Sequence, residues 1–575
     1  MTDIRRTVLW VVFTMSLVLL WDGWQKYNGH DSLFIKRAPQ TETVAGTAPA
    51  TTASGVSAAA AGTAAMASAA SPAASQAVAA ESVVIHTDVM NMTLSTQGGS
   101  VKRVELLKYL SAPEPALFDP LMEAVGLKKK PETPQEPIVL LDESRAYQAQ
   151  SGLLSTQGQA LPTHETVLTL VPGERSLKDG ENTLVVKMES PEVGGVKLVK
   201  TFTFTRGEYV VGVRHEIVNV GTAAVTPQLY VQLVRDGELI KSGPKMAPSS
   251  FTGPAVYNDK SGFHTVKFED IVKGKVDIDK SADSGWVAMI QHYFASAWLP
   301  TGNAPREFFV QQVGKGQPEL FRVGMLFTLP QLAPGATEAQ DDKLFVGPQE
   351  ENKLAVLAPG LQLVKDYGIF KALSQPLFWL LDHLHQWIGN WGWAIIGLVV
   401  LLKMAFFWLN ASAYRSMAKM KAVAPRIQAL NERYKDKPQE KQQEMMRIYR
   451  EEKINPIGSC LPIFLQMPFF MGLYWVLLSS VEMRGAPWLG WITDLSQRDP
   501  YFILPLILTA SSLLQVALNP KSPDPVQAKM MWFMPLAFSV MFFVFPSGLV
   551  LYWLTNNILS IAQQWLINKK MGVQN

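Results

Sequence analysis

The chain has 575 residues, of which 48% are hydrophobic, 18% are charged and one, Cys460, is a cysteine. This composition is too apolar for an average soluble protein, and a single cysteine excludes any internal disulfide. The net charge of +3 excludes few classes of protein, because it is a sum over a polar middle and more apolar ends.

The N-terminal residues 1–24 have the pattern of a membrane anchor. Arg5 and Arg6 precede an uncharged run that ends at Trp21, and no small-x-small cleavage site follows at the right distance. We therefore expect an uncleaved signal-anchor helix with its basic end inside, with a cleaved signal peptide as the alternative. Residues 25–80 are rich in Ala, Ser and Thr and should form a flexible linker, because they bury too little apolar surface to offset their ordering entropy.

Residues 81–350 have strand-like patterns separated by Gly, Asn, Asp and Pro. Alternation of apolar and polar residues is clear in Thr201–Thr205. The predicted strands are 83–87, 89–96, 101–107, 165–171, 183–188, 195–205, 209–218, 228–234 and 286–298. They predict one large all-β sandwich, which lies outside the membrane if the first helix leaves its N-terminus inside.

Residues 365–390 repeat apolar positions at three- and four-residue steps, with polar residues between them. This pattern predicts an amphipathic helix in the outer membrane interface. The alternative is a buried helix of the β domain.

Residues 392–412 form an apolar stretch of the length needed to cross a bilayer, with Lys403 near its middle. A lysine at that depth costs roughly 2.5–3.5 kcal/mol on insertion scales, so we expect it to face a wet groove. The alternative is that its side chain extends to the membrane surface.

Residues 413–456 hold eleven Lys and Arg against six Asp and Glu, and they have helical spacing on both sides of 431–438. Such a basic excess beside a span predicts a cytoplasmic helical hairpin. Its methionines, Met417, Met420, Met445 and Met446, suit contacts with varied apolar partners. Packing of the two helices on each other explains them equally well.

Four further spans are predicted at about 460–481, 501–518, 530–545 and 549–567, with the turn Pro546-Ser547-Gly548 between the last two. Residues 568–575 would be a short cytoplasmic tail. The predicted fold is therefore a polytopic α-helical membrane protein with six transmembrane helices, both termini inside, and an all-β sandwich outside.

The sequence has none of the nucleotide-binding, metalloprotease or nucleophile-elbow motifs that mark reaction centres, so we expect neither an enzyme nor a metal or other cofactor. The predicted spans do carry polar residues that, together with Lys403, suggest a hydrated cavity: Gln466, Gln515, Thr555, Asn556, Asn557 and Gln563. Single amides in spans often hold helices together instead, and that alternative stays open for each of them.

Five motifs stand out in the C-terminal half: Met417-Ala418-Lys419-Met420, Asn455-Pro456-Ile457-Gly458, Leu465-Gln466-Met467-Pro468, residues 499–505 and residues 545–552. Together they resemble the YidC family of membrane protein insertases. Residues 392–567 carry the most specific resemblance, and Trp286, residues 291–294 and Trp298 resemble the periplasmic domain of the Gram-negative members.

The resemblance implies a five-helix core at 392–567, with a groove that opens to the cytoplasm and to lipid, and a periplasmic β-supersandwich. The family's groove cation is usually arginine, and Lys403 stands at that position. Lysine keeps the charge but loses the bidentate fork. The groove candidates implied by the family pattern are Gln466, Tyr552 and Trp553, to which the polar content of the spans adds Gln515 and Asn556.

The expected partners are nascent membrane proteins, the Sec translocon, membrane lipid and the ribosome, which would contact residues 413–456 and the loop near Pro520. No nucleic acid binding is expected except through the ribosome. The expected location is the bacterial inner membrane. A secondary transporter would show internal repeats and acidic residues in its spans, and we find neither. A membrane-anchored periplasmic scaffold is the second rival.

Overall fold

The computed structural model describes residues 80–111, 122–123, 136–238, 250–314, 318–434, 437–452, 461–518 and 525–570. The predicted N-terminal helix, most of the linker and the C-terminal tail from 571 lie outside these ranges, as do the loop near Pro520 and the Asn455–Gly458 motif. The side chains of Met417 and Met420 are also outside the described part.

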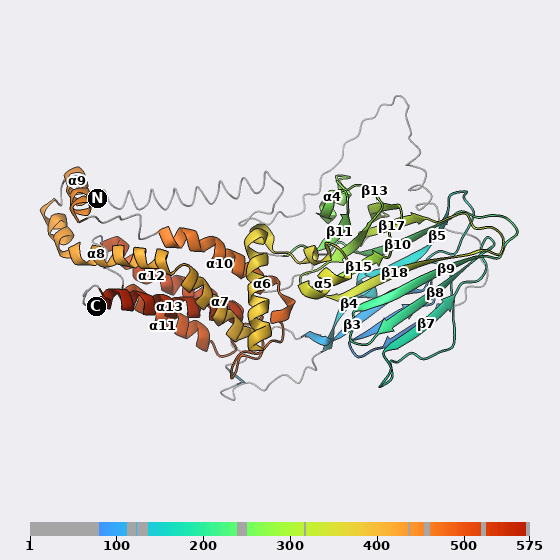
Figure 1. Ribbon diagram of the computed structural model, residues 1–575, viewed down its shortest axis with the longest axis horizontal. Coiled ribbons are helices and arrows are strands. Elements are labelled where there is room, and N and C mark those ends of the chain that lie inside the picture. The colour runs from blue at the N-terminus through green and yellow to red at the C-terminus, as the bar shows by residue number, and fades with distance from the viewer. Residues whose placement is uncertain are drawn as a thin grey trace, which may run out of the picture. The chain divides into compact units, whose positions relative to one another are not determined.

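The β region consists of two nine-stranded sheets, and every paired strand in both is antiparallel (Figure 1). The first sheet contains β1 (Ser82–His86), β2 (Met90–Ser95), β3 (Ser100–Ser111), β4 (Glu136–Leu141), β5 (Gln148–Ser155), β10 (Pro227–Asp236), β13 (Ser281–Ala282), β16 (Arg306–Val313) and β17 (Leu320–Thr328). The second contains β6 (Thr169–Leu170), β7 (Thr183–Glu189), β8 (Val196–Thr205), β9 (Val210–Asn219), β11 (Gly253–Asn258), β12 (Gly262–Thr265), β14 (Gly285–Ile290), β15 (Phe294–Pro300) and β18 (Thr337–Pro348).

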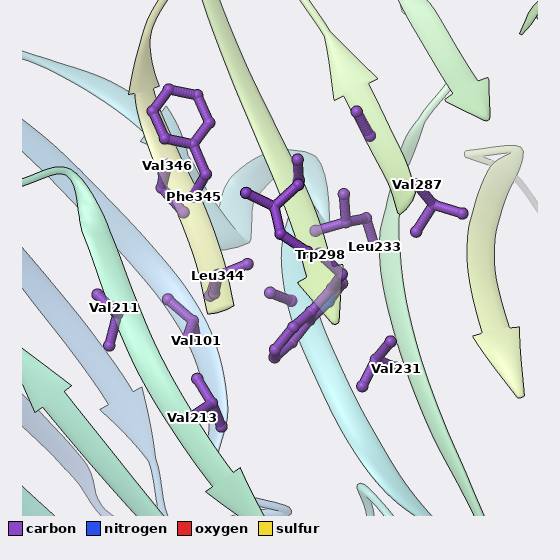
Figure 2. Packing of buried hydrophobic residues seen from close by; sticks show 14 of the residues in the cluster. Val101, Val211, Val213, Val231, Leu233, Val287, Trp298, Leu344, Phe345 and Val346 are labelled. Atoms are coloured by element: carbon purple, nitrogen blue, oxygen red, sulfur yellow. The ribbon is translucent and has the colours of Figure 1, made fainter. Parts of the chain in front are cut away.

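The two sheets enclose one apolar core. Figure 2 shows Val231 and Leu233 of β10 close to Trp298 of β15 and Leu344 of β18, so residues from both sheets meet there. Trp298 also donates its indole N–H to the carbonyl of Gln232 in the opposite sheet, at 3.0 Å. The prediction of an all-β sandwich is therefore confirmed.

Individual strands differ from the predicted ones. The predicted strand at 286–298 is two strands, β14 and β15, which pair with each other as a hairpin. The predicted strand at 165–171 shrinks to the two residues of β6, which pairs with β7 at the edge of its sheet, while Val167 bridges Gln97. The sequence pattern did not single out β4, β5, β11, β12, β13, β16, β17 or β18, although β5 and β17 lie in the interior of the first sheet and β18 in the interior of the second.

The C-terminal part is helical (Figure 1). Its helices are α5 (Glu351–Leu357), α6 (Lys371–Ile388), α7 (Trp391–Ala405), α8 (Phe407–Arg433), α9 (Pro438–Glu451), α10 (Leu461–Ser479), α11 (Ile503–Leu518), α12 (Pro525–Phe542) and α13 (Ser547–Lys570). A short helix, α4 (Phe268–Val272), belongs to the β region.

Local signals set the junction between α6 and α7. Gly389 adopts the left-handed conformation that ends α6, with φ of 75°. Asn390 then caps α7, because its side chain accepts a hydrogen bond from the Trp393 N–H at 3.1 Å. Helix α6 buries an apolar face that includes Leu377 and Leu381, and it exposes the large side chains of Trp379 and Trp387.

The predicted helix at 392–412 is interrupted. Helix α7 ends at Ala405, Phe406 has φ of −93° and ψ of 10°, and α8 starts at Phe407. The Phe406 N–H bonds to the carbonyls of both Leu402 and Met404, so the last turn of α7 tightens just after Lys403. Within the described ranges, no helix combines the length and the apolar character that crossing a membrane would require.

The packed centre of the helical part joins α6, α7, α10, α11, α12 and α13. Between α12 and α13, Ser547 and Gly548 bind the loop at 495–497. Ser547 donates its N–H and its hydroxyl to the Gln497 carbonyl at 2.7 and 2.8 Å, and Gly548 donates its N–H to the Leu495 carbonyl at 2.9 Å. These bonds fix the start of α13, which carries most of the polar residues discussed below.

Candidate functional site

Lys403 faces helix α13. Its Nζ donates a hydrogen bond to the Ser560 hydroxyl at 2.7 Å, and the lysine side chain is half-buried. Ser560 is 5% exposed and donates its own hydroxyl hydrogen to the Asn556 carbonyl one turn earlier, at 2.7 Å. The Ser560 oxygen therefore presents its lone pairs to the lysine and acts purely as an acceptor there.

A second polar contact lies just beyond the break between α7 and α8. Asn410 of α8 is 4% exposed, and its side-chain oxygen accepts a hydrogen bond from Gln466 of α10 at 2.9 Å. Gln563 of α13 donates to the Phe407 carbonyl at 3.3 Å. Residues of α7, α8, α10 and α13 thus form one polar region around the break.

Two predicted site residues, Tyr552 and Trp553, belong to an aromatic cluster one to two turns before Ser560. The Tyr552 ring stacks on Phe470 with centroids 5.8 Å apart. Trp553 meets Phe470 and Phe542 edge to face, at 4.5 and 4.7 Å. This cluster packs α13 against α10 and α12.

Helix α13 has another polar face, turned to α11. Asn557 donates to the hydroxyls of Ser511 and Ser512 at 2.9 and 3.1 Å. Gln515, a predicted groove residue, lies half-buried on α11 one turn beyond these serines. The structure therefore assigns Asn557 to interhelical packing and keeps it apart from the Lys403 contact.

The predicted hairpin consists of α8 and α9, which pack through Val423, Ile427 and Ile448. Met445 is half-buried against this cluster, as the packing alternative requires. Met446 is 48% exposed and stays available to a partner.

Ser560 and Asn410 are site residues that the sequence pattern did not predict. Ser560 lies four residues after Asn556 and three before Gln563, so helical spacing places all three on one face. That spacing was the available signal, although a lone serine in a helix more often bonds its own backbone.

The sandwich contains a buried polar cluster of a different kind. Lys200 of β8 is fully buried and donates to the carbonyls of Gly98 and Ser151 at 2.5 and 2.8 Å, and to the Ser151 hydroxyl at 2.7 Å. The Ser151 hydroxyl also contacts His215 Nε2 at 2.8 Å, and His215 Nδ1 lies 3.1 Å from the Asp342 carboxylate.

Burial lowers the pKa of Lys200 to about 7 and also lowers the pKa of His215. A neutral imidazole with its proton on Nδ1 accepts from the Ser151 hydroxyl at Nε2 and carries its N–H beside the Asp342 carboxylate, without an aligned hydrogen bond to it. The contacts from Ser151 to His215 and from His215 to Asp342 follow the arrangement of a hydrolase triad. However, each of the three residues is at most 3% exposed. A substrate cannot reach the hydroxyl, so the cluster joins the two sheets and performs no chemistry.

Comparisons with known proteins decide the family. Residues 383–574 match the family described as the 60Kd inner membrane protein, and residues 122–380 match the YidC periplasmic domain. The chain is 50% identical over 579 residues to the membrane protein insertase YidC of Cupriavidus taiwanensis, with 99% of this chain and 98% of that protein covered. The chain belongs to the YidC family of membrane protein insertases.

Two further relatives agree with this assignment. The insertases of Cupriavidus metallidurans and Ralstonia nicotianae are 51% and 49% identical, each covering 99% of this chain and 98% of its own length. A crystal structure of an active YidC insertase covers 84% of this chain and 91% of its own, at 18% identity and a TM-score of 0.39. A putative aldose 1-epimerase of Escherichia coli covers 47% of this chain and 99% of its own, at 11% identity and a TM-score of 0.27.

Family membership confirms the resemblance found in the sequence. It also identifies the chain as an inner-membrane protein with a periplasmic domain, and as a non-enzymatic one. The match at 383–574 includes Lys403, Asn410, Gln466 and Ser560, so the polar region lies within the part of the chain that this insertase family shares.

Proposed function

We propose that this chain inserts nascent membrane proteins into the bacterial inner membrane and helps them fold and assemble. The observation that carries this proposal is Lys403. It is a half-buried cation within an apolar helix, and its partner among the described residues is a neutral hydroxyl at 2.7 Å. A charge in apolar surroundings that has no counter-charge within the described ranges is available to an acidic group that enters from outside.

The proposed mechanism follows from the partition of a substrate segment between water, the groove and lipid. A polar flank of the substrate enters a groove from the cytoplasm, where Lys403 and the nearby amides, among them Gln466 and Asn556, replace part of its hydration. The apolar segment then moves sideways into lipid, and burial of its surface drives this step at roughly 25 cal/mol per Å². Tyr552 and Trp553, together with Gln515, complete the proposed groove lining.

We infer a topology of six spans with both termini in the cytoplasm. Helices α10, α11, α12 and α13 would each cross the membrane, and α7 would cross together with the start of α8. The sixth span is the predicted N-terminal helix at residues 1–24. The low charge of these segments and the basic excess at 413–456 support this orientation.

We propose two larger partners as well. The chain works alone on small substrates and with the Sec translocon on larger ones, as its family resemblance implies. The hairpin of α8 and α9 contacts the ribosome or the emerging substrate, and the exposure of Met446 supports this role.

A complementation experiment tests the proposed groove charge. The native protein is depleted from cells, and Lys403→Arg, Lys403→Ala or Lys403→Glu is supplied at matched levels. Insertion of a small single-span protein with an acidic translocated flank is then measured by protease protection. We expect arginine to work and alanine and glutamate to fail. Normal insertion by all three variants would show that the charge has no role, and that the shape of the core drives insertion.

A further inference from the structure

Lys200, Lys365 and Lys403 are each buried or half-buried, and each has a different environment. Lys200 is held by three neutral oxygen acceptors in the sandwich. Lys365 is fully buried but has carboxylate partners, with its Nζ 3.2 Å from Glu482 and 4.0 Å from Glu351. Lys403 has one bond within the described residues, to the Ser560 hydroxyl.

These environments differ in how many N–H groups, and how much charge, each lysine can still offer to another molecule. In its charged form Lys200 donates all three N–H groups to its three acceptors, and the carboxylates near Lys365 cancel the charge of Lys365. At Lys403 one N–H is used, and the other two have no partner among the residues that the structure describes. A hydroxyl carries no formal charge, so the bond fixes the position of the ammonium group without neutralising it.

The Ser560 hydroxyl is well suited to this task, because its hydrogen is committed to the Asn556 carbonyl at 2.7 Å. It therefore cannot rotate to donate elsewhere without losing that bond. Ser560 is also buried, at 5% exposure, so water does not compete for its oxygen. Lysine has four rotatable bonds, and a fixed acceptor narrows the positions that its Nζ can occupy.

We propose that Ser560 is a positioning residue that holds the Lys403 ammonium group in the groove while leaving its charge and two N–H groups free for an acidic substrate flank. This inference rests on the proposed function and names a further residue of the same site. Its chemical consequence is selectivity, because Ser560 should matter for substrates with carboxylates in the flank and not for substrates with neutral flanks.

The test uses the full-length protein in depleted cells and two substrates that differ in the flank alone, one with Asp and Glu and one with Asn and Gln. Ser560→Ala removes the acceptor, Ser560→Thr keeps a hydroxyl, and Lys403→Met removes the cation. Ser539→Ala is the matched control, since Ser539 is 7% exposed and its hydroxyl bonds a carbonyl of its own helix, that of Leu536, at 2.7 Å.

We expect Ser560→Ala to lower insertion of the acidic-flank substrate roughly three- to tenfold, as for the loss of one hydrogen bond of ordinary net strength. The neutral-flank substrate should insert normally, and Ser560→Thr and Ser539→Ala should behave as wild type for both. In a Lys403→Met background, Ser560→Ala should change nothing further, because the partner is gone.

Three results would overturn the proposal. An unchanged ratio between the two substrates in Ser560→Ala shows that Lys403 does not need Ser560. An equal loss on both substrates, or a loss that Ser560→Thr does not rescue, assigns Ser560 to packing. In each case the proposed function still stands if Lys403→Met lowers insertion of the acidic-flank substrate and leaves the neutral-flank substrate unchanged. Failure of Lys403→Met to change the ratio removes the proposed role of the charge itself.

Discussion

The two parts of the chain bury a lysine in opposite ways. In the sandwich, Lys200 occupies an inward position of β8 and satisfies all three of its N–H groups with Gly98 and Ser151. In the helical part, Lys403 is half-buried and bonds Ser560. A fully satisfied buried cation fixes structure, whereas a partly satisfied one retains binding capacity for another molecule. The contrast predicts that the first lysine governs stability and the second governs insertion.

The largest expected effect comes from removing Lys200. Lys200→Ala leaves a cavity and deprives the carbonyls of Gly98 and Ser151 of their donor, so the sandwich should lose about 3–5 kcal/mol of unfolding free energy. Pulse proteolysis of the purified protein in urea measures this loss. Lys197→Ala, at an exposed position of the same strand, is the control and should change little. Equal stability of the two variants would contradict a structural role for Lys200.

Lys403→Met should have a large effect on insertion and a small effect on stability. Insertion of an acidic-flank substrate should fall by roughly tenfold or more, since ~1.4 kcal/mol of lost attraction already corresponds to a factor of ten. The stability of the purified protein should change by no more than about 1 kcal/mol, because methionine fills a similar volume and one hydrogen bond is lost. The same urea experiment and a protease-protection assay measure the two quantities. A large loss of stability would remove the contrast with Lys200.

The pH dependence of stability sharpens the comparison. The pKa of Lys200 is about 7 in the folded protein, below the 10.5 of an exposed lysine, so the unfolded chain binds more protons between these values. Stability should therefore rise as pH increases from about 7 to about 10, by at most ~1.4 kcal/mol per pH unit. Lys200→Met should lack this gain in stability. The unfolding free energy of the wild type should therefore rise relative to that of the variant between pH 7 and pH 10. A constant difference from pH 6 to pH 10 would show that Lys200 does not change its charge.

The smallest effect is expected at the second polar face of α13. Asn557→Ala removes two hydrogen bonds to Ser511 and Ser512, and interhelical bonds of this type contribute about 0.6 kcal/mol each. The helical part should be destabilised by about 1 kcal/mol in a detergent unfolding titration, and insertion at matched protein levels should stay normal. A selective loss of acidic-flank insertion would mean that Asn557 belongs to the groove.

Lys403 and Lys200 differ in how much of their environment the sequence alone predicts. Lys403 was identified because a charge in a long apolar run is a local signal. Lys200 was overlooked, although Val196, Leu198, Phe202 and Phe204 occupy the same inward row of β8 and mark its position as buried. A lysine in a half-apolar strand suggests an outward position, and its acceptors come from segments 49 and 102 residues away.

The sequence by itself determined the sandwich, the family and the position of the lone cation, because alternation, motifs and charge in an apolar run are properties of neighbouring residues. The tertiary structure decided the helix break at Phe406, the pairing of Lys403 with Ser560 and the burial of Lys200. Lys403 and Ser560 are 157 residues apart, and a serine is chemically ordinary until folding brings a cation to it. Partners of this kind depend on how helices and sheets pack, which no local pattern encodes.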